Sequence, residues 1–556
     1  MPQSFKFDYP VILMVPPVIK GERAALRNLA RGPVPSLPPL ARQHVPARQR
    51  PRGLGAMLPA AMLGAAAPMA ELAGGEQPIN STLGWDTVFA VPVSKVNDHF
   101  AASKLYPTDF SGSFSGGLYS VTITGNFGAW RIALGGSGAI VKLSIPIASG
   151  TMAVKGGNSF DLKNGTIFVE VKLNYLPQPS EGAKGTPNNL LVANKPMDQT
   201  GHVAQVIQVT IPNQTDPTVL AAATGCFQDF FDKNLARVSF VFNTVNLNAV
   251  ADKEAFQWLK PTTSSYAYYE PGNATSLNQA VFGVLCMVNN NSPGNNTNQL
   301  APSAIPTQSG VTSDSGFSIN NQLFLRQMVL PVMSASFNAN NPSGKIDQSY
   351  FKIQNGDTEI VNTKDIPLAT VVYGRINYYP QCTKFKLTIM ATELQIYTMV
   401  HVNISPGIDT YVEQTVSFKP TLKTDAQGNQ YLDFVQSHSE PPNHWTNVAK
   451  SIVITSIVIG IIGFVLAGIA AIVLSGAAAV CAAIVIGVVF GLAAAVPQLI
   501  KAVQAEGVVG KVPSIAGLIT AATHDVKWTG GQDFKIAFTQ INGTFQMGGI
   551  AFPPAT

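Results

Sequence analysis

The sequence predicts an α+β protein: an antiparallel sheet forms most of the body, and a long apolar helical hairpin lies near the C-terminus. Two observations predict this fold class. Many segments between about residues 80 and 440 alternate apolar and polar side chains, which is the period-two pattern of half-buried strands. The fifty residues between Lys450 and Lys501 contain no Asp, Glu, Lys, Arg or His. Only 12% of the 556 residues are charged, about half the usual share, and this balance also favours sheet.

The first 78 residues differ in composition from the rest of the chain. Pro, Ala and Arg dominate and no hydrophobic period persists, so we expect residues 1–78 to form a disordered leader. Residues 1–75 carry nine Lys and Arg against three Asp and Glu, which leaves 27 basic and 28 acidic residues for the remainder. A nearly neutral body offers no surface for phosphate groups, so nucleic acid is not expected as a partner.

Residues 79–446 are expected to form the body. The Gly-rich segment Gly135–Gly138 lies between two alternating segments, as a hairpin turn requires, and no Lys follows it as in a phosphate-binding loop. Helices are expected over Ser94–Leu105 and over Ile319–Met333, the latter bent or ended by Pro331. Residues 506–556 are expected to return to the body as closing strands near Asp525–Thr529 and Phe534–Phe538. The clearest alternation is in Val141, Leu143, Ile145 and Ile147 and in Ile167, Val169, Val171 and Leu173.

The uncharged run within residues 447–505 predicts two apolar helices, with a break at Ser475-Gly476. About 20 apolar residues span the roughly 30 Å of hydrocarbon in a bilayer. The hairpin could lie in lipid, against a partner or inside the fold, and we favour the bilayer because water would expose a very large apolar surface. The spacing of Gly487 and Gly491 would let two helices approach closely. The residues expected to face lipid are Ile454, Ile457, Ile461, Phe464, Leu466, Ile484, Val488, Phe490 and Leu499.

The sequence lacks the usual signatures of catalysis. It contains no G-x-S-x-G elbow, no P-loop, no H-E-x-x-H and no C-x-x-C. The pair His524-Asp525 is a poor acid–base pair, because neighbours in a strand point to opposite faces. The four cysteines, Cys226, Cys286, Cys382 and Cys481, have neither disulfide-framework nor metal-ligand spacing. We therefore expect no enzyme, no cofactor and no metal site.

Several short strings, in their order and spacing, resemble the OrfX-type accessory proteins encoded beside clostridial neurotoxins, which are similar to the tubular lipid-binding (TULIP) superfamily. The resemblance implies a strongly curved antiparallel sheet wrapped around a long helix, an elongated apolar groove, and lipid or membrane interaction in the service of a toxin or secreted complex. Trp85 and Asp86 are its most specific pair; Asp86 either contacts a ligand or, as we favour, accepts backbone N–H bonds while Trp85 packs under the sheet. The strings are Gly84-Trp85-Asp86-Thr87-Val88-Phe89-Ala90 followed by Val96-Asn97, Trp130 ahead of Gly135-Gly136-Ser137-Gly138, Ile145-Pro146-Ile147, Trp258-Leu259-Lys260-Pro261 before Tyr266-Ala267-Tyr268, Phe282-Gly283-Val284-Leu285-Cys286-Met287, and Phe324-Leu325 with Leu330-Pro331.

Three functions remain open at this stage. The favoured one is a non-enzymatic lipid- or membrane-binding accessory protein, membrane-associated or secreted, with toxin or sister accessory proteins as possible partners. The second is a membrane-inserting, pore-forming toxin component that uses a hairpin over residues 452–499. The third, a lipid-active enzyme, lacks a nucleophile and base in the sequence.

Overall fold

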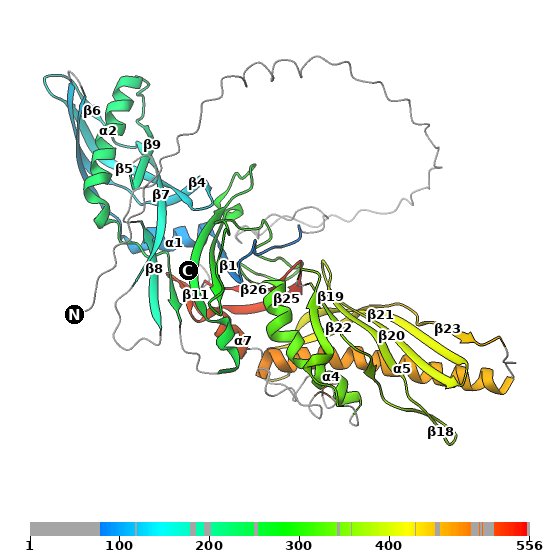
Figure 1. Cartoon of the computed structure of the whole chain (residues 1–556). Coiled ribbons are helices and arrows are strands. Elements are labelled where there is room, and N and C mark those ends of the chain that lie inside the picture. Colours follow the sequence, from blue (N-terminus) through cyan, green and yellow to red (C-terminus); the bar gives the residue numbers. More distant parts are fainter. Residues whose placement is uncertain are drawn as a thin grey trace, which may run out of the picture. The chain divides into compact units, whose positions relative to one another are not determined.

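The described residues form antiparallel sheets of six, ten and eight strands and a separate two-stranded hairpin (Figure 1). The structure is a computed structural model. It describes residues 78–116, 119–177, 185–193, 202–248, 254–341, 345–356, 358–428, 430–450, 456–490, 500, 503 and 516–552. All of the predicted leader except Pro78 lies outside these residues.

The six-stranded sheet combines strands from distant parts of the chain. The strand β1 lies between β12 and β13, and β26, near the C-terminus, pairs with β13. Every residue of β1, β12 and β13 is buried, and β1 and β12 accordingly read as nearly continuous apolar runs rather than as an alternation. In sheet order the strands are β11 (Pro261–Tyr269), β12 (Val281–Val288), β1 (Thr87–Pro92), β13 (Ser315–Ile319), β26 (Phe545–Ile550) and β25 (Lys535–Ile541).

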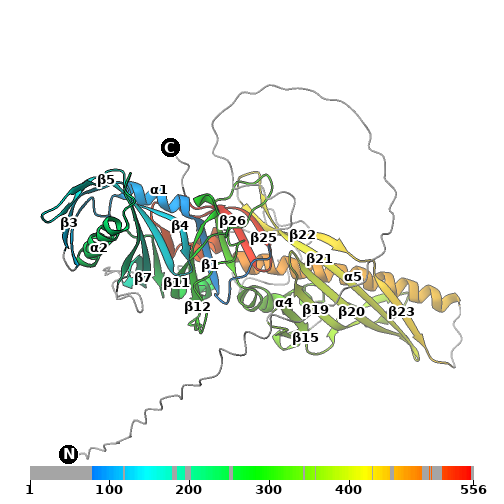
Figure 2. The ribbon, with the colours of Figure 1, turned by 90° about the horizontal axis from the view of Figure 1, so that it is seen from above.

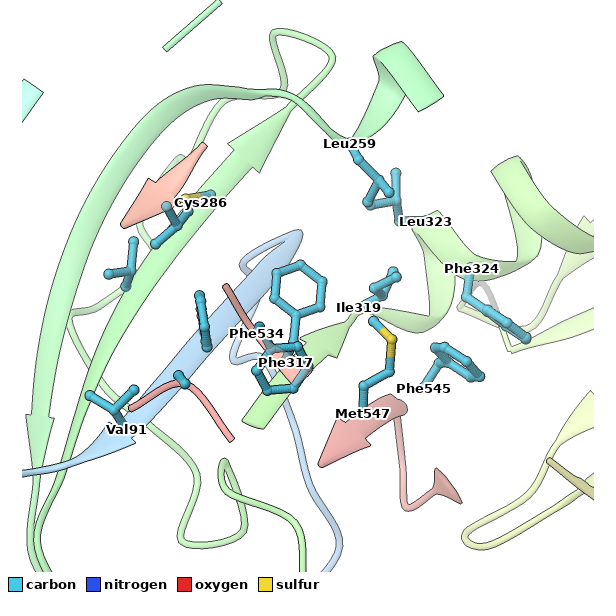
Figure 3. Close-up of a cluster of buried hydrophobic side chains, with 14 of the residues drawn as sticks. Val91, Leu259, Cys286, Phe317, Ile319, Leu323, Phe324, Phe534, Phe545 and Met547 are labelled. Atoms are coloured by element: carbon cyan, nitrogen blue, oxygen red, sulfur yellow. The ribbon is translucent and has the colours of Figure 1, made fainter. Parts of the chain in front are cut away.

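Aromatic side chains pack this central sheet against the helical segment that follows β13 (Figure 3). Phe89 meets Phe317 and Phe534 edge-on, with ring centroids 6.0 and 5.5 Å apart. Phe324 stacks on Phe545 of β26, with centroids 5.0 Å apart. Aromatic pairs of this kind add about 0.5–1.5 kcal/mol each beyond their buried area. Figure 3 also labels Val91, Leu259, Cys286, Ile319, Leu323 and Met547 in the same cluster.

The ten-stranded sheet carries helix α2 (Pro217–Asn234) against β2, β3 and β9 (Figure 2). The helix begins after Asp216, whose carboxylate accepts the N–H of Thr218 at 2.8 Å. Its Phe227 packs on Phe110, with ring centroids 5.1 Å apart. The strands are β2 (Asp109–Gly116), β3 (Tyr119–Phe127), β4 (Arg131–Ser137), β5 (Ile140–Val154), β6 (Ser159–Asp161), β7 (Thr166–Pro177), β8 (Thr186–Val192), β9 (Ala204–Thr210), β10 (Asn243–Leu247) and β24 (Val526–Trp528).

The eight-stranded sheet carries helix α5 (Ser456–Phe490), which packs on β20, β21 and β22 and beside helix α4 (Met333–Asn340). Figure 2 shows α5 running along the length of this sheet. The strands are β14 (Phe351–Gln354), β15 (Glu359–Asn362), β16 (Ile366–Pro367), β19 (Gln381–Ile389), β20 (Leu394–Ser405), β21 (Ile408–Thr424), β22 (Gln430–Ser439) and β23 (Asn443–Val448). The separate hairpin is β17 (Val371–Tyr373) and β18 (Ile376–Tyr378).

The remaining described elements are short. Helix α1 (Val93–Ser103) lies where the sequence predicts one, and the predicted helix after Ile319 begins two residues later. Pro331 lies in a 3-10 turn inside that helical segment, so the proline changes the winding of the helix without ending it. The elements are α3 (Asn321–Phe324), a π-turn (Leu325–Val329), α7 (Ala516–Thr523) and 3-10 turns at Leu235–Arg237, Glu254–Leu259, Leu277–Gln279, Leu330–Val332 and Gln348–Tyr350.

Two predictions about the architecture differ from the structure. Ser475 and Gly476 lie inside the 35-residue helix α5, so the predicted break at these residues is wrong. Packing of the apolar residues on both sides of them outweighs the weaker helix propensity of Ser and Gly. Residues 477–490 of the predicted second arm continue α5, and residues 491–499 lie outside the described residues. In place of one curved sheet around one helix, two sheets each carry their own helix, α2 and α5.

Candidate functional site

Helix α5 is buried along one face in its first two thirds. The buried residues Val465, Ile469, Val473 and Ala477 recur every four positions and face the eight-stranded sheet and α4. From Ala479 to Val485 every residue is buried, so this part of the helix is enclosed on all sides. The helix is therefore held firmly towards its C-terminal end and lies on the surface before it.

The opposite face of α5 is exposed and apolar. Phe464 is 48% exposed and Leu474 is 41% exposed, and Ala467 and Ala471 lie exposed between them. No residue of α5 is charged. Helices on the surface of water-soluble domains normally place charged side chains outward, so this face is unusual for a surface in contact with water.

The β17–β18 hairpin continues this apolar surface. The ring of Tyr373 packs on Phe464, with centroids 5.0 Å apart, and Val371 packs where Gly468 leaves room on α5. Val372, Ile376 and Tyr379 are exposed on the same hairpin, together with Arg375 at the turn. We call this surface the α5 face and define it by Phe464, Ala467, Ala471, Leu474, Tyr373 and Ile376. Val372 is exposed on the other side of the hairpin, because neighbouring residues in a strand point to opposite faces. Contiguous exposed apolar surfaces mark sites for protein partners, lipids or membranes.

A small apolar cavity lies between α5, α4 and the sheet. Its lining includes Phe337, Cys382, Val400 and Ile472, and it leaves about 20 Å³ for the centre of a water-sized molecule. That volume suits about one water molecule, so at this place the predicted elongated groove is not open to an acyl chain. Hydrogen bonds between Asn340 and Ser475 join α4 to α5 beside the cavity, from the Asn340 amide to the Ser475 carbonyl at 3.1 Å and from the Ser475 hydroxyl to the Asn340 side-chain oxygen at 3.2 Å.

The residues predicted to face lipid are distributed unevenly over the structure. Phe464 lies on the α5 face, whereas Ile461 and Leu466 are half-buried beside it. Ile484 is fully buried and therefore does not lie on that face. Ile454, Leu499 and Gly491 lie outside the described residues, as do the side-chain surroundings of Ile457, Gly487, Val488 and Phe490. The sequence did not indicate the exposed hairpin residues, because Val-Val-Tyr and Ile-Asn-Tyr also fit an ordinary buried strand.

Asp86 and Trp85 have structural partners. The Asp86 carboxylate is buried and accepts hydrogen bonds from the Val288 backbone N–H and the Asn291 side chain, both at 2.9 Å, and from the Asn320 side chain at 3.0 Å. The Trp85 indole donates to the carbonyl of Thr297 at 3.1 Å. These contacts tie β1 to the loops after β12 and β13, as the favoured structural interpretation of the pair predicts.

The other motifs also have structural roles. The Gly-rich turn is the β4–β5 hairpin connection, and it docks on β11 through reciprocal backbone hydrogen bonds between Gly138 and Tyr268. Asp525 does not pair with its neighbour His524; its carboxylate accepts from the Lys260 ammonium group at 2.5 Å in a buried ion pair. Within the described ranges, no group of three or more His, Cys, Asp or Glu could hold a metal ion.

A family model described as "OrfX-like: Protein OrfX2/OrfX3/P47" matches residues 82–549. The chain belongs to the OrfX-like family. The resemblance to OrfX-type accessory proteins that the short strings predict is thereby confirmed.

Individual relatives match this OrfX-like chain along most of their length. Protein OrfX3 of Clostridium botulinum (strain Kyoto / Type A2) is 25% identical over 506 residues, covering 84% of this chain and 98% of the relative. Protein OrfX3 of Paraclostridium bifermentans is 24% identical over 502 residues, with the same coverage. The structure of P47 from Clostridium botulinum A2 has a TM-score of 0.55 at 17% identity and covers 85% of this chain and 99% of P47. That likeness establishes a shared fold.

The OrfX-like chain has one helix, among the residues that the structure describes, that is long and apolar enough to cross a membrane. It is the Gly460–Val485 part of α5, and only 22% of its most apolar window is buried. This helix exposes an apolar face between Gly460 and Ser475 and is buried from Ala479 to Val485.

Proposed function

We propose that this OrfX-like protein is a non-enzymatic accessory protein that binds the surface of a lipid bilayer through the α5 face. One observation carries the proposal: a helix without charge exposes Phe464 and Leu474 beside the exposed apolar hairpin β17–β18. Apolar surface removed from water contributes about 25 cal/mol per Å², and a helix lying in the headgroup region needs no change of fold to gain it.

The chemistry of the hairpin suits the boundary between water and lipid. Tyr373 has an apolar ring and a polar hydroxyl, which is the combination enriched where membrane proteins cross this boundary. The long side chain of Arg375 can keep its charge among the headgroups while its stem lies on apolar surface. The α5 face therefore combines an apolar centre with amphipathic side chains at its edge.

A more specific form of the proposal is a TULIP-like grip on acyl chains between α5 and the eight-stranded sheet. The small cavity at Phe337, Cys382 and Ile472 lies in this layer, and α5 would have to move away from the sheet for a chain to enter. Binding of this kind needs no nucleophile and no cofactor. Sister accessory proteins or a toxin would be the partners of the lipid-bound form.

Vesicle flotation with the full chain tests the proposal. Vesicles of phosphatidylcholine and phosphatidylserine that hold a trapped dye should carry the protein upward without releasing the dye. Leu474→Gln should lower the bound fraction, because it places an amide on the α5 face. Ile207→Gln is the matched control, since Ile207 on β9 is 40% exposed and Leu474 41%. Equal binding by both variants, or no flotation of the wild type, would contradict the proposal.

The alternative is a pore-forming component in which α5 leaves the sheet and spans the bilayer. The 26 residues of Gly460–Val485 rise about 39 Å as a helix, which exceeds the roughly 30 Å of hydrocarbon. This function predicts dye release that rises with bound protein, so release in the same experiment would replace surface docking by insertion.

A further inference from the structure

A line of residues that face the core crosses four strands of the ten-stranded sheet. The register sets Tyr175 of β7 opposite Leu190 of β8. Leu190 in turn lies opposite Asn243 of β10, and Asn243 lies opposite Trp528 of β24. Directly opposed residues point to the same face of a sheet, with Cβ atoms about 4.5–5.5 Å apart. Asn243 is completely buried and Trp528 is 6% exposed, so two polar side chains lie next to each other in the core.

The Asn243 amide is held from one side. Its oxygen accepts a hydrogen bond from the Tyr175 hydroxyl at 2.7 Å, and Tyr175 reaches it across β8. The oxygen and the nitrogen of a planar amide point in different directions, so Nδ2 is directed away from Tyr175 and towards β24. The neighbouring residue on β24 is Trp528, whose indole nitrogen is also a donor. Neither Asn243 Nδ2 nor Trp528 Nε1 has an acceptor among the described residues.

Two neighbouring N–H donors in a core need a shared acceptor. Buried polar groups nearly always have a hydrogen-bond partner, which is either another protein group or an ordered water molecule. The two donors cannot serve each other, because neither nitrogen accepts a hydrogen bond. An oxygen atom that accepts two hydrogen bonds at once satisfies both. Water is the smallest molecule that supplies such an oxygen, and a buried water makes two to four hydrogen bonds.

The facing six-stranded sheet brings further polar groups to this part of the core. The ring of Phe282 on β12 packs on Trp528, with centroids 5.7 Å apart. Cys286 lies on the same face of β12 as Phe282 and opposite Ser264 of β11. Burial raises the pKa of the Tyr175 hydroxyl well above its usual range, and the nearby Cys286 thiol raises it further. The Ser264 hydroxyl, too, makes no hydrogen bond within the described ranges.

We propose that an internal water molecule binds between Asn243 and Trp528 and links the ten-stranded sheet to the six-stranded sheet. Its oxygen accepts hydrogen bonds from Asn243 Nδ2 and Trp528 Nε1. Its protons are directed to the facing strands, where Ser264 Oγ and Cys286 Sγ are the acceptors. Among the described strands β24 pairs with β10 only, so the water adds a side-chain bridge to the backbone pairing that holds β24. Water binding here is independent of membrane binding, because α5 packs on the eight-stranded sheet.

The indole of Trp130 provides a comparison within the same protein. Its Nε1 is also buried and makes no hydrogen bond in the part of the chain that the structure describes. The rings around it are aromatic: Tyr106 stacks on it at 5.6 Å, and Phe127 and Phe231 meet it edge-on at 5.5 and 5.9 Å. An indole N–H among such rings can point at an aromatic face. We therefore expect Trp130 to bind no water.

Nuclear Overhauser measurements between water and the indole protons of the full chain test the proposal. Trp528→Phe and Trp130→Phe identify the two signals among the five tryptophans. The Trp528 indole proton should show a cross-peak to a long-lived water, whereas the Trp130 indole proton should show none. Asn243→Leu removes Nδ2 and should abolish the Trp528 cross-peak. Tyr175→Phe is the matched control, because it loses the same 2.7 Å hydrogen bond but keeps Nδ2, and its cross-peak should remain.

Four results would overturn this inference. The first is a wild type without a cross-peak at Trp528. The second is a cross-peak of equal strength at Trp130, which would indicate general entry of water into the core. The third is a Trp528 cross-peak that survives Asn243→Leu. The fourth is its loss in Tyr175→Phe, which would show that the signal was relayed through the phenol hydroxyl. Circular dichroism melts check that each variant is folded, and the two wild-type indoles provide the decision if Asn243→Leu does not fold.

Discussion

The buried ion pair between Lys260 and Asp525 gives a prediction whose size follows from its geometry. The ammonium nitrogen and the carboxylate oxygen are 2.5 Å apart, and the side chains are only 8% and 3% exposed. Lys260→Met removes the cation, keeps a side chain of similar length and leaves a buried carboxylate without its partner. Breaking a buried pair in this way costs about 3–5 kcal/mol. The loss should be a large part of the stability of a typical domain.

The assay is urea unfolding followed by the intrinsic fluorescence of the five tryptophans, one of which, Trp528, lies three residues after Asp525. The double variant Lys260→Met, Asp525→Leu should regain most of the loss, because it removes both charges. Lys233→Met is the surface control: its pair with Asp229 lies within helix α2 with a 64% exposed Lys, and it should cost less than about 0.5 kcal/mol. A cost below about 1 kcal/mol for Lys260→Met, or a double variant less stable than the single one, would refute the reasoning.

Three further predictions concern the α5 face and the thiols. Phe464→Ala should weaken vesicle binding about fiftyfold, because the 48% of Phe464 that is exposed represents about 100 Å² and about 2.4 kcal/mol. The control is Phe114→Ala, which changes a 39% exposed Phe on β2 and should leave vesicle binding unchanged. An equal loss of binding by both variants in flotation assays would contradict the assignment of Phe464 to the membrane-binding surface. Cys382 lines the cavity beneath α5, and burial raises its pKa to about 12. In a variant that keeps only this cysteine, thiol labelling at pH 8 should therefore stay slow when vesicles are added. Faster labelling in the presence of vesicles would show that α5 leaves the sheet. Burial raises the pKa of Cys286 as well, from 9.0 to about 12. The stability that the protonated thiols of Cys286 and Cys382 contribute is therefore complete below pH 9 and is lost as the pH rises towards 12, by about 1.4 kcal/mol per pH unit for each thiol. In thermal melts, the stability of the Cys286→Ala, Cys382→Ala variant should fall less steeply with alkaline pH than that of the wild type, and an identical fall would be evidence against this linkage.

The sequence predicted those elements whose hydrophobic period reflects burial on one face. The strands β5 and β7 alternate along their first halves because one side faces the core, and both were recognised. Helix α2 was not predicted, because its sequence Ala-Ala-Ala-Thr-Gly-Cys carries little apolar contrast before the phenylalanines begin. The buried face of that helix is set by its packing on β2 and β9, and contacts between such separate segments do not appear in a local sequence pattern.

The candidate site was predicted in part. The absence of charge identified α5 as a region of interest, and Phe464 was among the residues expected to face lipid. A uniformly apolar helix has no polar face, so its sequence gives no direction for burial, and one residue expected to face lipid, Ile484, is fully buried in this structure. The hairpin β17–β18 becomes part of the site only through Tyr373, which reaches Phe464 across some ninety positions of the chain.

The order of strands in the six-stranded sheet has a consequence for synthesis on the ribosome. The strand β1 is made first, whereas β26, which completes the pairing of β13, is not made until residues 545–550. Contacts between such distant segments are slow to form, and the unpaired edge of β13 stays exposed in the meantime. The uncharged α5 is made before β26, so the nascent chain must carry this aggregation-prone segment while its central sheet is unfinished, and folding without a chaperone should become less efficient as protein concentration rises.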